Sequence, residues 1–108
     1  MGLKHLATFA VEQAMKYVLI DIVDDTLTNA EGAKLYALLD KSIADENILE
    51  LSFHGTTALS SSFLNSSIGN LLDKYDFEHF KGFVKFVDLR QSVANQLLDY
   101  LRSCDLQV

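Results

Sequence analysis

The chain has 108 residues, of which 49 % are hydrophobic, and its fifteen acidic and nine basic residues give a formal net charge of −6. This length predicts one domain with a core of its own, and the apolar content excludes a wholly disordered chain. The negative charge argues against nucleic-acid binding, because neutralising phosphates requires surplus lysine and arginine.

Signals for membrane insertion or secretion are not evident in the sequence. No uninterrupted apolar run approaches the roughly 20 residues that span a bilayer. The chain opens without a basic region, an apolar region and a cleavage site, and its single cysteine, Cys104, can form no intramolecular disulfide. We therefore expect a cytoplasmic protein that makes no membrane contact.

The first part of the chain, Gly2 to Met15, fits two patterns. One set of residues forms a helical stripe (Leu3, Leu6, Ala7, Ala10 and Ala14), and another alternates as in a strand (His5, Ala7, Phe9 and Val11). Helix-favouring residues dominate Ala10 to Lys16, which favours the helix, and no turn signal separates this part from the segment after it. That segment, Tyr17 to Val23, is apolar and predicts a strand covered on both faces.

A helix is predicted from Asn29 to Ala44. Thr28 and Glu31 have the spacing of a capping box, in which the threonine hydroxyl accepts from the glutamate amide and the carboxylate reaches back. Apolar residues then follow at helical spacing, namely Leu35, Leu38, Leu39 and Ile43. Gly32 in the first turn indicates either a tolerated glycine, which we favour, or a close approach of another backbone.

The central stretch runs from Ile48 to Tyr75. Ile48 to Phe53 alternates as a strand, a turn follows at His54-Gly55-Thr56-Thr57, and a helix is predicted over Phe63 to Tyr75. The helical stripe consists of Leu64, Ile68, Leu71, Leu72 and Tyr75. Between turn and helix lies the serine run Ser60-Ser61-Ser62.

The residues from Asp76 to Lys81 predict a connection with a helical turn at Phe77 to Phe80. The segment Phe83 to Val87 predicts a third strand. A last helix is expected from Asp88, and the C-terminal Asp105 to Val108 is expected to fray. The apolar stripe of this last helix consists of Val93, Leu97, Leu98, Leu101 and Cys104. Alternating strands and helices with long crossovers predict one α/β domain, with helices packed on a mostly parallel sheet of about four strands.

Catalytic signatures are weak. His5, His54 and His79 lack metal-ligand spacing, no G-x-S-x-G surrounds the serines, and no phosphate-binding glycine loop follows a strand. We expect a non-enzymatic protein without metal or cofactor.

The serine run has a local physical role. Serines at a helix start accept hydrogen bonds from unpaired amides, and the positive helix end favours a phosphate or a carboxylate. Two interpretations stay open: capping alone, or capping together with a surface for a partner or a phosphate. The second would use Ser60, Ser61, Ser62, Asn65 and Ser66, with the loop His54, Gly55, Thr56 and Thr57 as a ligand loop.

The segment Asn47 to Leu72 resembles the STAS-like family of unknown function. In that family a strand ends in Asp-Phe-x-Gly and Ser-Ser-Phe opens a helix, and this chain has Ser52-Phe53-His54-Gly55 and Ser61-Ser62-Phe63. Ala30-Glu31-Gly32 resembles the family's Arg-x-x-Gly, with Asn29 where arginine is usual, and the likeness covers roughly Tyr17 to Leu101. It implies the fold of STAS domains, which include the anti-sigma factor antagonists and domains of sulphate transporters.

In anti-sigma factor antagonists the matching helix start reads Asp-Ser-Ser-Gly, and a partner kinase phosphorylates one serine to switch binding off. Here Ser60 stands at the aspartate, Ser61 and Ser62 at the serines, and Phe63 at the glycine, so the resemblance places the phosphoacceptor at Ser62. The missing aspartate and the bulky Phe63 depart from the antagonist pattern.

These features lead to three functional hypotheses. The first is a bacterial regulatory module that docks a protein partner, such as a kinase-like or regulatory ATPase, through the serine-rich helix start, with phosphorylation as a switch. The second is a sensor of a small molecule or anion at the same helix start, assisted by Lys74, Lys81 or Lys85. The third is a dedicated protein inhibitor encoded on a mobile element. A hydrolase that uses one of the serines, paired with His54, ranks below these three. The oligomeric state is not predicted.

Overall fold

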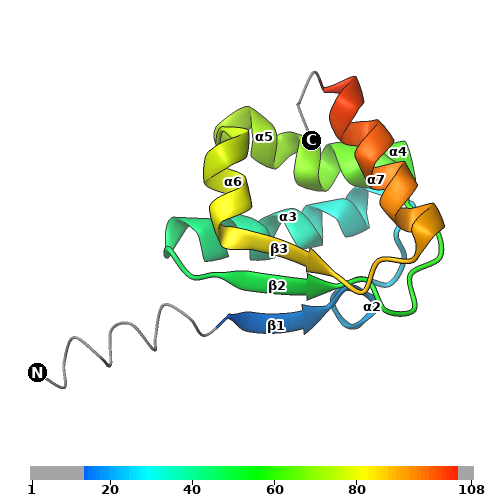
Figure 1. Ribbon diagram of the computed structural model, residues 1–108, viewed down its shortest axis with the longest axis horizontal. Helices are drawn as coiled ribbons and strands as arrows, with labels where there is room; N and C mark the ends of the chain where they lie inside the picture. The colour runs from blue at the N-terminus through cyan, green and yellow to red at the C-terminus, as the bar shows by residue number, and fades with distance from the viewer. Residues whose placement is uncertain (1–13, 105–108) are drawn as a thin grey trace, which may run out of the picture.

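The computed structural model describes residues 14–104, which form a sheet and a set of helices (Figure 1). The strands are β1 (Met15–Val18), β2 (Leu49–Ser52) and β3 (Val84–Val87). The helices are α2 (Leu19–Ile22), α3 (Asn29–Ala44), α4 (Ser61–Leu64), α5 (Asn70–Lys74), α6 (Phe77–Phe83) and α7 (Gln91–Ser103), and a π-helical segment, η1 (Asn65–Gly69), joins α4 to α5. The two interpretations of Gly2 to Met15, and the fraying expected for Asp105 to Val108, fall almost wholly outside the described residues.

The sheet is parallel, with the strand order β1-β2-β3. The predicted α/β class and parallel pairing are confirmed, but the described part of the chain has three strands, not four. The strand expected over Tyr17 to Val23 is confirmed only for Tyr17 and Val18, because β1 ends at Val18 and α2 follows directly. Leu19 is buried while Ile20 is 48 % exposed, so the apolar run is not covered on both sides. A short apolar run does not distinguish a strand from a helical turn by periodicity alone.

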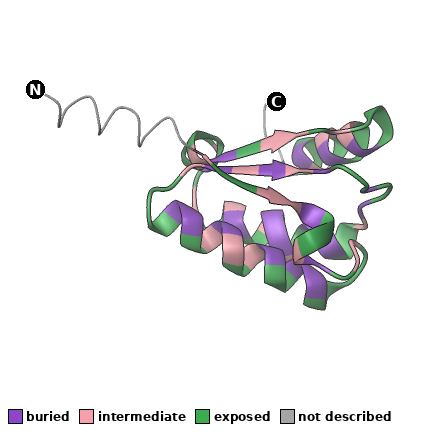
Figure 2. Ribbon diagram, turned by 90° about the horizontal axis from the view of Figure 1, so that it is seen from below, coloured by how far each residue is buried: buried purple, intermediate pink, exposed green. Residues whose placement is uncertain are grey.

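The two faces of the sheet differ in polarity. The face that carries Leu49, Leu51 and Val84 is buried beneath the helices, and Figure 2 shows the strands as one layer with helices beneath them. No residue of the strands' other face is buried; it carries Lys16, Val18, Glu50, Ser52, Lys85 and Val87. Parallel sheets are usually covered on both faces, so this open polar face is an uncommon feature.

The start of α3 follows the predicted capping box only in part. Thr28 Oγ1 accepts from the Glu31 amide at 3.4 Å, as expected. The Glu31 carboxylate does not return to Thr28 but accepts from the Asp24 amide at 2.6 Å, and the Thr28 amide donates to Asp25 at 3.0 Å. The carboxylate of Glu31 therefore holds the loop after α2 against the helix.

The core lies between the sheet and the helices. Most of its buried helical side chains come from α3 (Leu35, Leu39 and Ile43), from α4 to α5 (Phe63, Leu64, Ile68 and Leu71) and from α7 (Val93, Leu97 and Leu101). The predicted stripes are thus largely confirmed, although Cys104 is exposed.

Three boundaries differ from the sequence prediction. Helical structure begins at Ser61 rather than Phe63, Phe83 ends α6 instead of starting β3, and α7 begins at Gln91. Asp88 adopts φ 58°, which helices do not contain, so the last helix cannot start there.

Gly32 permits a close contact between α3 and the α4–η1 stretch. A Cβ atom at Gly32 would collide with Ser66 Oγ and lie 2.7 Å from the carbonyl oxygen of Phe63. The interpretation of Gly32 as a merely tolerated glycine is therefore wrong, and the close approach of another backbone is correct.

Candidate functional site

The carboxyl ends of the three strands meet at one end of the sheet, where α3, α4 and α7 all begin (Figure 1). This arrangement follows from parallel strands, because each strand leads into a loop at the same edge. Ligands of open α/β sheets bind at this edge. The serine run lies here, at the start of the helical stretch from Ser61 to Lys74.

Ser60 is the cap of this helical stretch. Its Oγ accepts from the Phe63 amide at 3.0 Å and donates to the Leu27 carbonyl at 2.7 Å. The Ser60 amide donates to the Thr26 carbonyl at 3.1 Å. Ser60 therefore has a structural task, since it joins the start of α4 to the loop that precedes α3.

Ser61 and Ser62 are exposed in the first turn of α4. Because Ser60 already provides the cap, neither of their hydroxyls is needed for capping. The predicted helix start made of hydroxyl groups is present and open to solvent.

Asn65 and Ser66 do not join this exposed pair. Asn65 Oδ1 accepts from the Tyr100 hydroxyl at 2.7 Å, so it contacts α7. Ser66 Oγ donates to the Ser62 carbonyl at 2.8 Å and lies against Gly32 of α3. Both side chains thus make contacts within the fold, and the predicted five-residue surface reduces to Ser61 and Ser62 with Ser60 as their anchor.

The predicted ligand loop is also divided. Gly55 has φ 83°, which favours glycine, and Ile20 covers it. Thr56 is 2 % exposed, and its Oγ1 has no hydrogen-bond partner within the described part of the chain. Thr57 is exposed. His54 turns to the open face of the sheet, where it lines a hollow of about 350 Å³ with Glu50, Ser52, Asp88 and β1 residues. The histidine and the serine run therefore belong to different surfaces.

A family model described as a STAS-like domain of unknown function (DUF4325) matches residues 31–94, which is more than half of the chain. The chain belongs to this family. No curated protein and no solved structure matches the chain. The match confirms the predicted resemblance, and it spans the serine run and two of the three strands but not β1.

Within the STAS-like domain, Phe63 is 1 % exposed and part of the core. The position at which antagonists carry glycine is therefore used here for packing, while the preceding serines remain on the surface. This explains how the helix start keeps two exposed hydroxyls although its third residue is bulky.

Two apolar side chains that the sequence interpretation missed lie at the same end of the STAS-like domain. Ile20 is 48 % and Leu27 is 56 % exposed. The Leu27 carbonyl accepts a hydrogen bond from Ser60, which places Leu27 at the helix start. Ile20 packs on Gly55, near the other end of the loop that joins β2 to α4. A leucine within the polar run Asp24 to Asn29 is the one signal that could have revealed this pair.

Acidic groups surround this end of the domain. Glu31 is 8 % exposed, and its hydrogen bond from Lys34, followed by that from the Asp24 amide, holds the pKa of its carboxyl below the usual value. The Leu27 amide likewise lowers the pKa of Asp25. These carboxylates are therefore charged at neutral pH, and Lys34 is engaged by Glu31 and Asp24 at 2.9 and 3.5 Å.

The lysines expected to assist an anion lie elsewhere. Lys74 pairs with Asp40 at 3.0 Å, Lys81 pairs with Glu78 at 3.2 Å, and Lys85 donates to the Lys81 carbonyl at 2.7 Å. Lys74 ends α5, Lys81 is in α6 and Lys85 follows in β3, and Figure 1 shows α5, α6 and the start of β3 at the end of the domain away from the start of α4.

Among residues 14–104, no cluster of three or more histidine, cysteine, aspartate or glutamate side chains is arranged to hold a metal ion. No helix in this described range is long and apolar enough to cross a membrane.

Proposed function

We propose that this STAS-like domain is a non-enzymatic, cytoplasmic interaction module that binds a protein partner through the start of α4. The observation that carries this proposal is the pair of exposed serines, Ser61 and Ser62, at the same end of the domain as the exposed Ile20 and Leu27. Together they form what we call the serine–leucine surface, which consists of Ile20, Leu27, Ser61 and Ser62.

A protein partner fits this surface better than a small anion does. Ile20 and Leu27 are two of the large apolar side chains that the described structure leaves exposed, and a protein partner would remove them from water. An anion would leave Ile20 and Leu27 in water, and the three lysines proposed to assist it lie at the other end of the domain.

Phosphorylation is the proposed switch, and Ser62 is the proposed acceptor. A phosphate in the first turn would be stabilised by the positive end of the helix, so the modification is compatible with the fold. It would also add negative charge and bulk two residues after Ser60, which is bonded to Leu27, on the surface that the proposed partner contacts. By resemblance to the antagonists, the partner class we propose is a kinase-like or regulatory ATPase.

Charge substitution at the surface tests this proposal. The wild type, Ser61→Glu and Ser62→Glu are each immobilised, and the proteins they capture from an extract of the source cells are compared. Ser92→Glu is the matched control, because Ser92 is exposed at the second position of α7 as Ser62 is in α4. Both glutamates have the same relation to their helix dipoles, so a general charge effect would be equal.

We expect the wild type and Ser92→Glu to capture a common protein that the other two variants lose. Capture that is equal for all four would show that the proposed surface is wrong. The identity of the captured protein then separates a regulatory ATPase from the target of a dedicated inhibitor. A rise in melting temperature with inorganic phosphate, absent from Ser62→Glu, would favour the anion sensor instead.

A further inference from the structure

The β1 strand lies at an edge of the sheet, and one side of its main chain is free within the described structure. The Met15 amide donates to the Ile48 carbonyl at 2.9 Å, so the main-chain groups of Met15 and Tyr17 point toward β2. Because these groups alternate in direction along a strand, those of Lys16 and Val18 point outward. Such an edge is a template for pairing with another strand.

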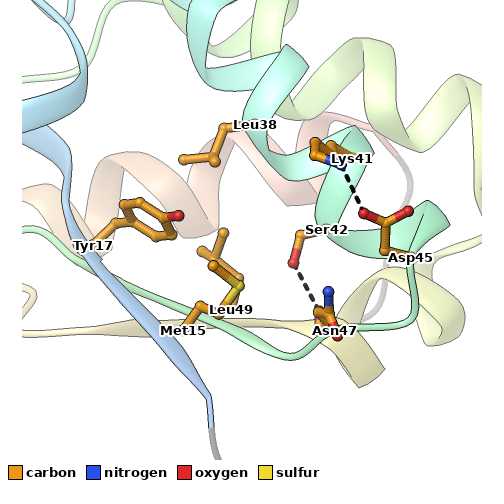
Figure 3. A pocket seen from close by; sticks show the side chains of 8 residues that line it. All are labelled: Met15, Tyr17, Leu38, Lys41, Ser42, Asp45, Asn47 and Leu49. Carbon is orange, nitrogen blue, oxygen red and sulfur yellow. Dashed lines mark hydrogen bonds and ion pairs between the residues drawn. The ribbon is translucent and has the colours of Figure 1, made fainter.

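An apolar groove of about 250 Å³ lies beside this edge, between β1 and the C-terminal half of α3 (Figure 3). Its apolar lining comes from Met15, Tyr17, Leu38 and Leu49. The Lys41–Asp45 ion pair, at 2.9 Å, and the bond from Ser42 to the Asn47 carbonyl, at 2.7 Å, form its polar border. Met15 is 47 % exposed here, so a strand added at the edge would bury apolar surface as well as satisfy main-chain groups.

The occupant that the sequence favours is a second copy of this chain. Between Leu3 and Ile20 the sequence has no Asn, Asp, Gly or Pro, the residues that close tight hairpins. The residues between Leu3 and β1 therefore do not predict a tight hairpin that would return the same copy to this edge. Two copies related by a twofold axis pair both β1 edges at once, because each copy offers the same edge to the other.

We propose that β1 pairs antiparallel with β1 of a second copy around a twofold axis at Met15. In this register Met15 faces its own symmetry mate, and Lys16 faces Ala14. A register centred on Lys16 would oppose two like charges, and one centred on Tyr17 would place Met15 against Leu19, which is already part of α2.

The hydrogen-bond directions agree with the same register. The main-chain groups of Ala14 and Lys16 point outward, so this pair exchanges both bonds. The Met15 groups are used toward β2, so the two copies of Met15 form a non-hydrogen-bonded pair, whose Cα atoms lie about 4.5 Å apart in antiparallel sheets. The two side chains then meet over the groove.

Disulfide trapping tests the register. Met15→Cys is made together with Cys104→Ser, which removes the exposed native thiol. We expect oxidation to give a linked dimer, because two cysteines at a non-hydrogen-bonded pair lie within disulfide reach. Lys16→Cys in the same background is the control. In the proposed register residue 16 faces residue 14 of the other copy, so the two cysteines at position 16 are not opposite one another and should link less. Equal linking of both variants, or a wild type that light scattering finds monomeric at every concentration, would overturn the proposal.

A proline substitution tests the main-chain edge itself. Lys16→Pro removes an amide hydrogen that points away from β2, and proline is tolerated on edge strands where that side is free. We expect Lys16→Pro to be monomeric and to unfold cooperatively, whereas Lys16→Ala, which keeps the amide, remains dimeric. A dimeric Lys16→Pro would contradict strand pairing, and if this variant does not fold the disulfide experiment decides. Neither result depends on partner capture by the serine–leucine surface.

Discussion

At the scale of single residues, three adjacent serines have different tasks. Ser60 Oγ takes part in two hydrogen bonds that join α4 to the loop before α3, while Ser61 and Ser62 extend into solvent. The cap could be predicted because it needs only a serine and the three residues after it. The bond to Leu27 could not, because Leu27 is 33 residues away in the sequence.

We expect Ser60→Ala to lower the free energy of unfolding by about 1–2 kcal/mol, the usual loss for a helix cap. Ser61→Ala should change it by less than about 0.5 kcal/mol, because this exposed hydroxyl caps nothing. Urea unfolding of both variants measures the difference. Equal values for the two would show that Ser60 is not the structural anchor of the surface.

The Glu31 carboxylate predicts a dependence of stability on pH. Lys34 and the Asp24 amide lower its pKa in the folded state, so ionised Glu31 stabilises the fold. For a lowered pKa, this stabilisation is present above the unfolded value, 4.5, and is lost as the pH falls through the folded value. We expect Glu31→Gln to be less stable than the wild type at pH 7, with a difference that shrinks below pH 4.5. A difference that is constant from pH 7 to acid would exclude this role.

At the scale of elements, the helix stripes and strand alternation could be predicted, and the boundaries could not. The apolar periodicity of α3 and α7 repeats over several turns, which gives a strong signal. The α2 turn and the π-helical η1 depend on contacts. In η1 the hydroxyls of Ser66 and Ser67 donate to the Phe63 carbonyl at 3.2 and 2.7 Å, which satisfies a backbone group in the wider turn.

The contact of α3 with the α4–η1 stretch gives a matched pair of glycine substitutions. Gly32→Ala should lower the free energy of unfolding by about 1–3 kcal/mol despite the higher helix propensity of alanine, because its Cβ would meet a backbone carbonyl. Gly82→Ala in α6 meets nothing within 4 Å and should raise it by up to about 1 kcal/mol. Chemical denaturation measures both. A stabilising Gly32→Ala would mean that the two helices separate more easily than their packing indicates.

At the scale of the whole molecule, the order of strands and helices predicted the parallel sheet, because each long crossover returns the chain in the same direction. The number of strands and the open polar face could not be predicted. Leu49 and Leu51 alternate with polar residues in β2, which is compatible with one covered face, but a strand's neighbours are not encoded locally. The edge position of β1 is a property of the assembled sheet alone.

The two proposed surfaces lie at different ends of the molecule, which yields a last prediction. Met15 is at the amino end of β1, whereas the serine–leucine surface lies at the carboxyl ends of the strands (Figure 1). Antiparallel pairing at Met15 therefore leaves both copies of that surface open. We expect the disulfide-linked Met15→Cys dimer to capture as much partner per chain as the reduced protein does. A partner that is itself dimeric should be retained more strongly by the linked dimer, because it can bind both copies at once. Binding of one partner per linked dimer, measured by light scattering of the complex, would show that the surfaces interfere. Because linking changes neither Ser61 nor Ser62, such a result would place the conflict in the arrangement of the two copies rather than in the helix start.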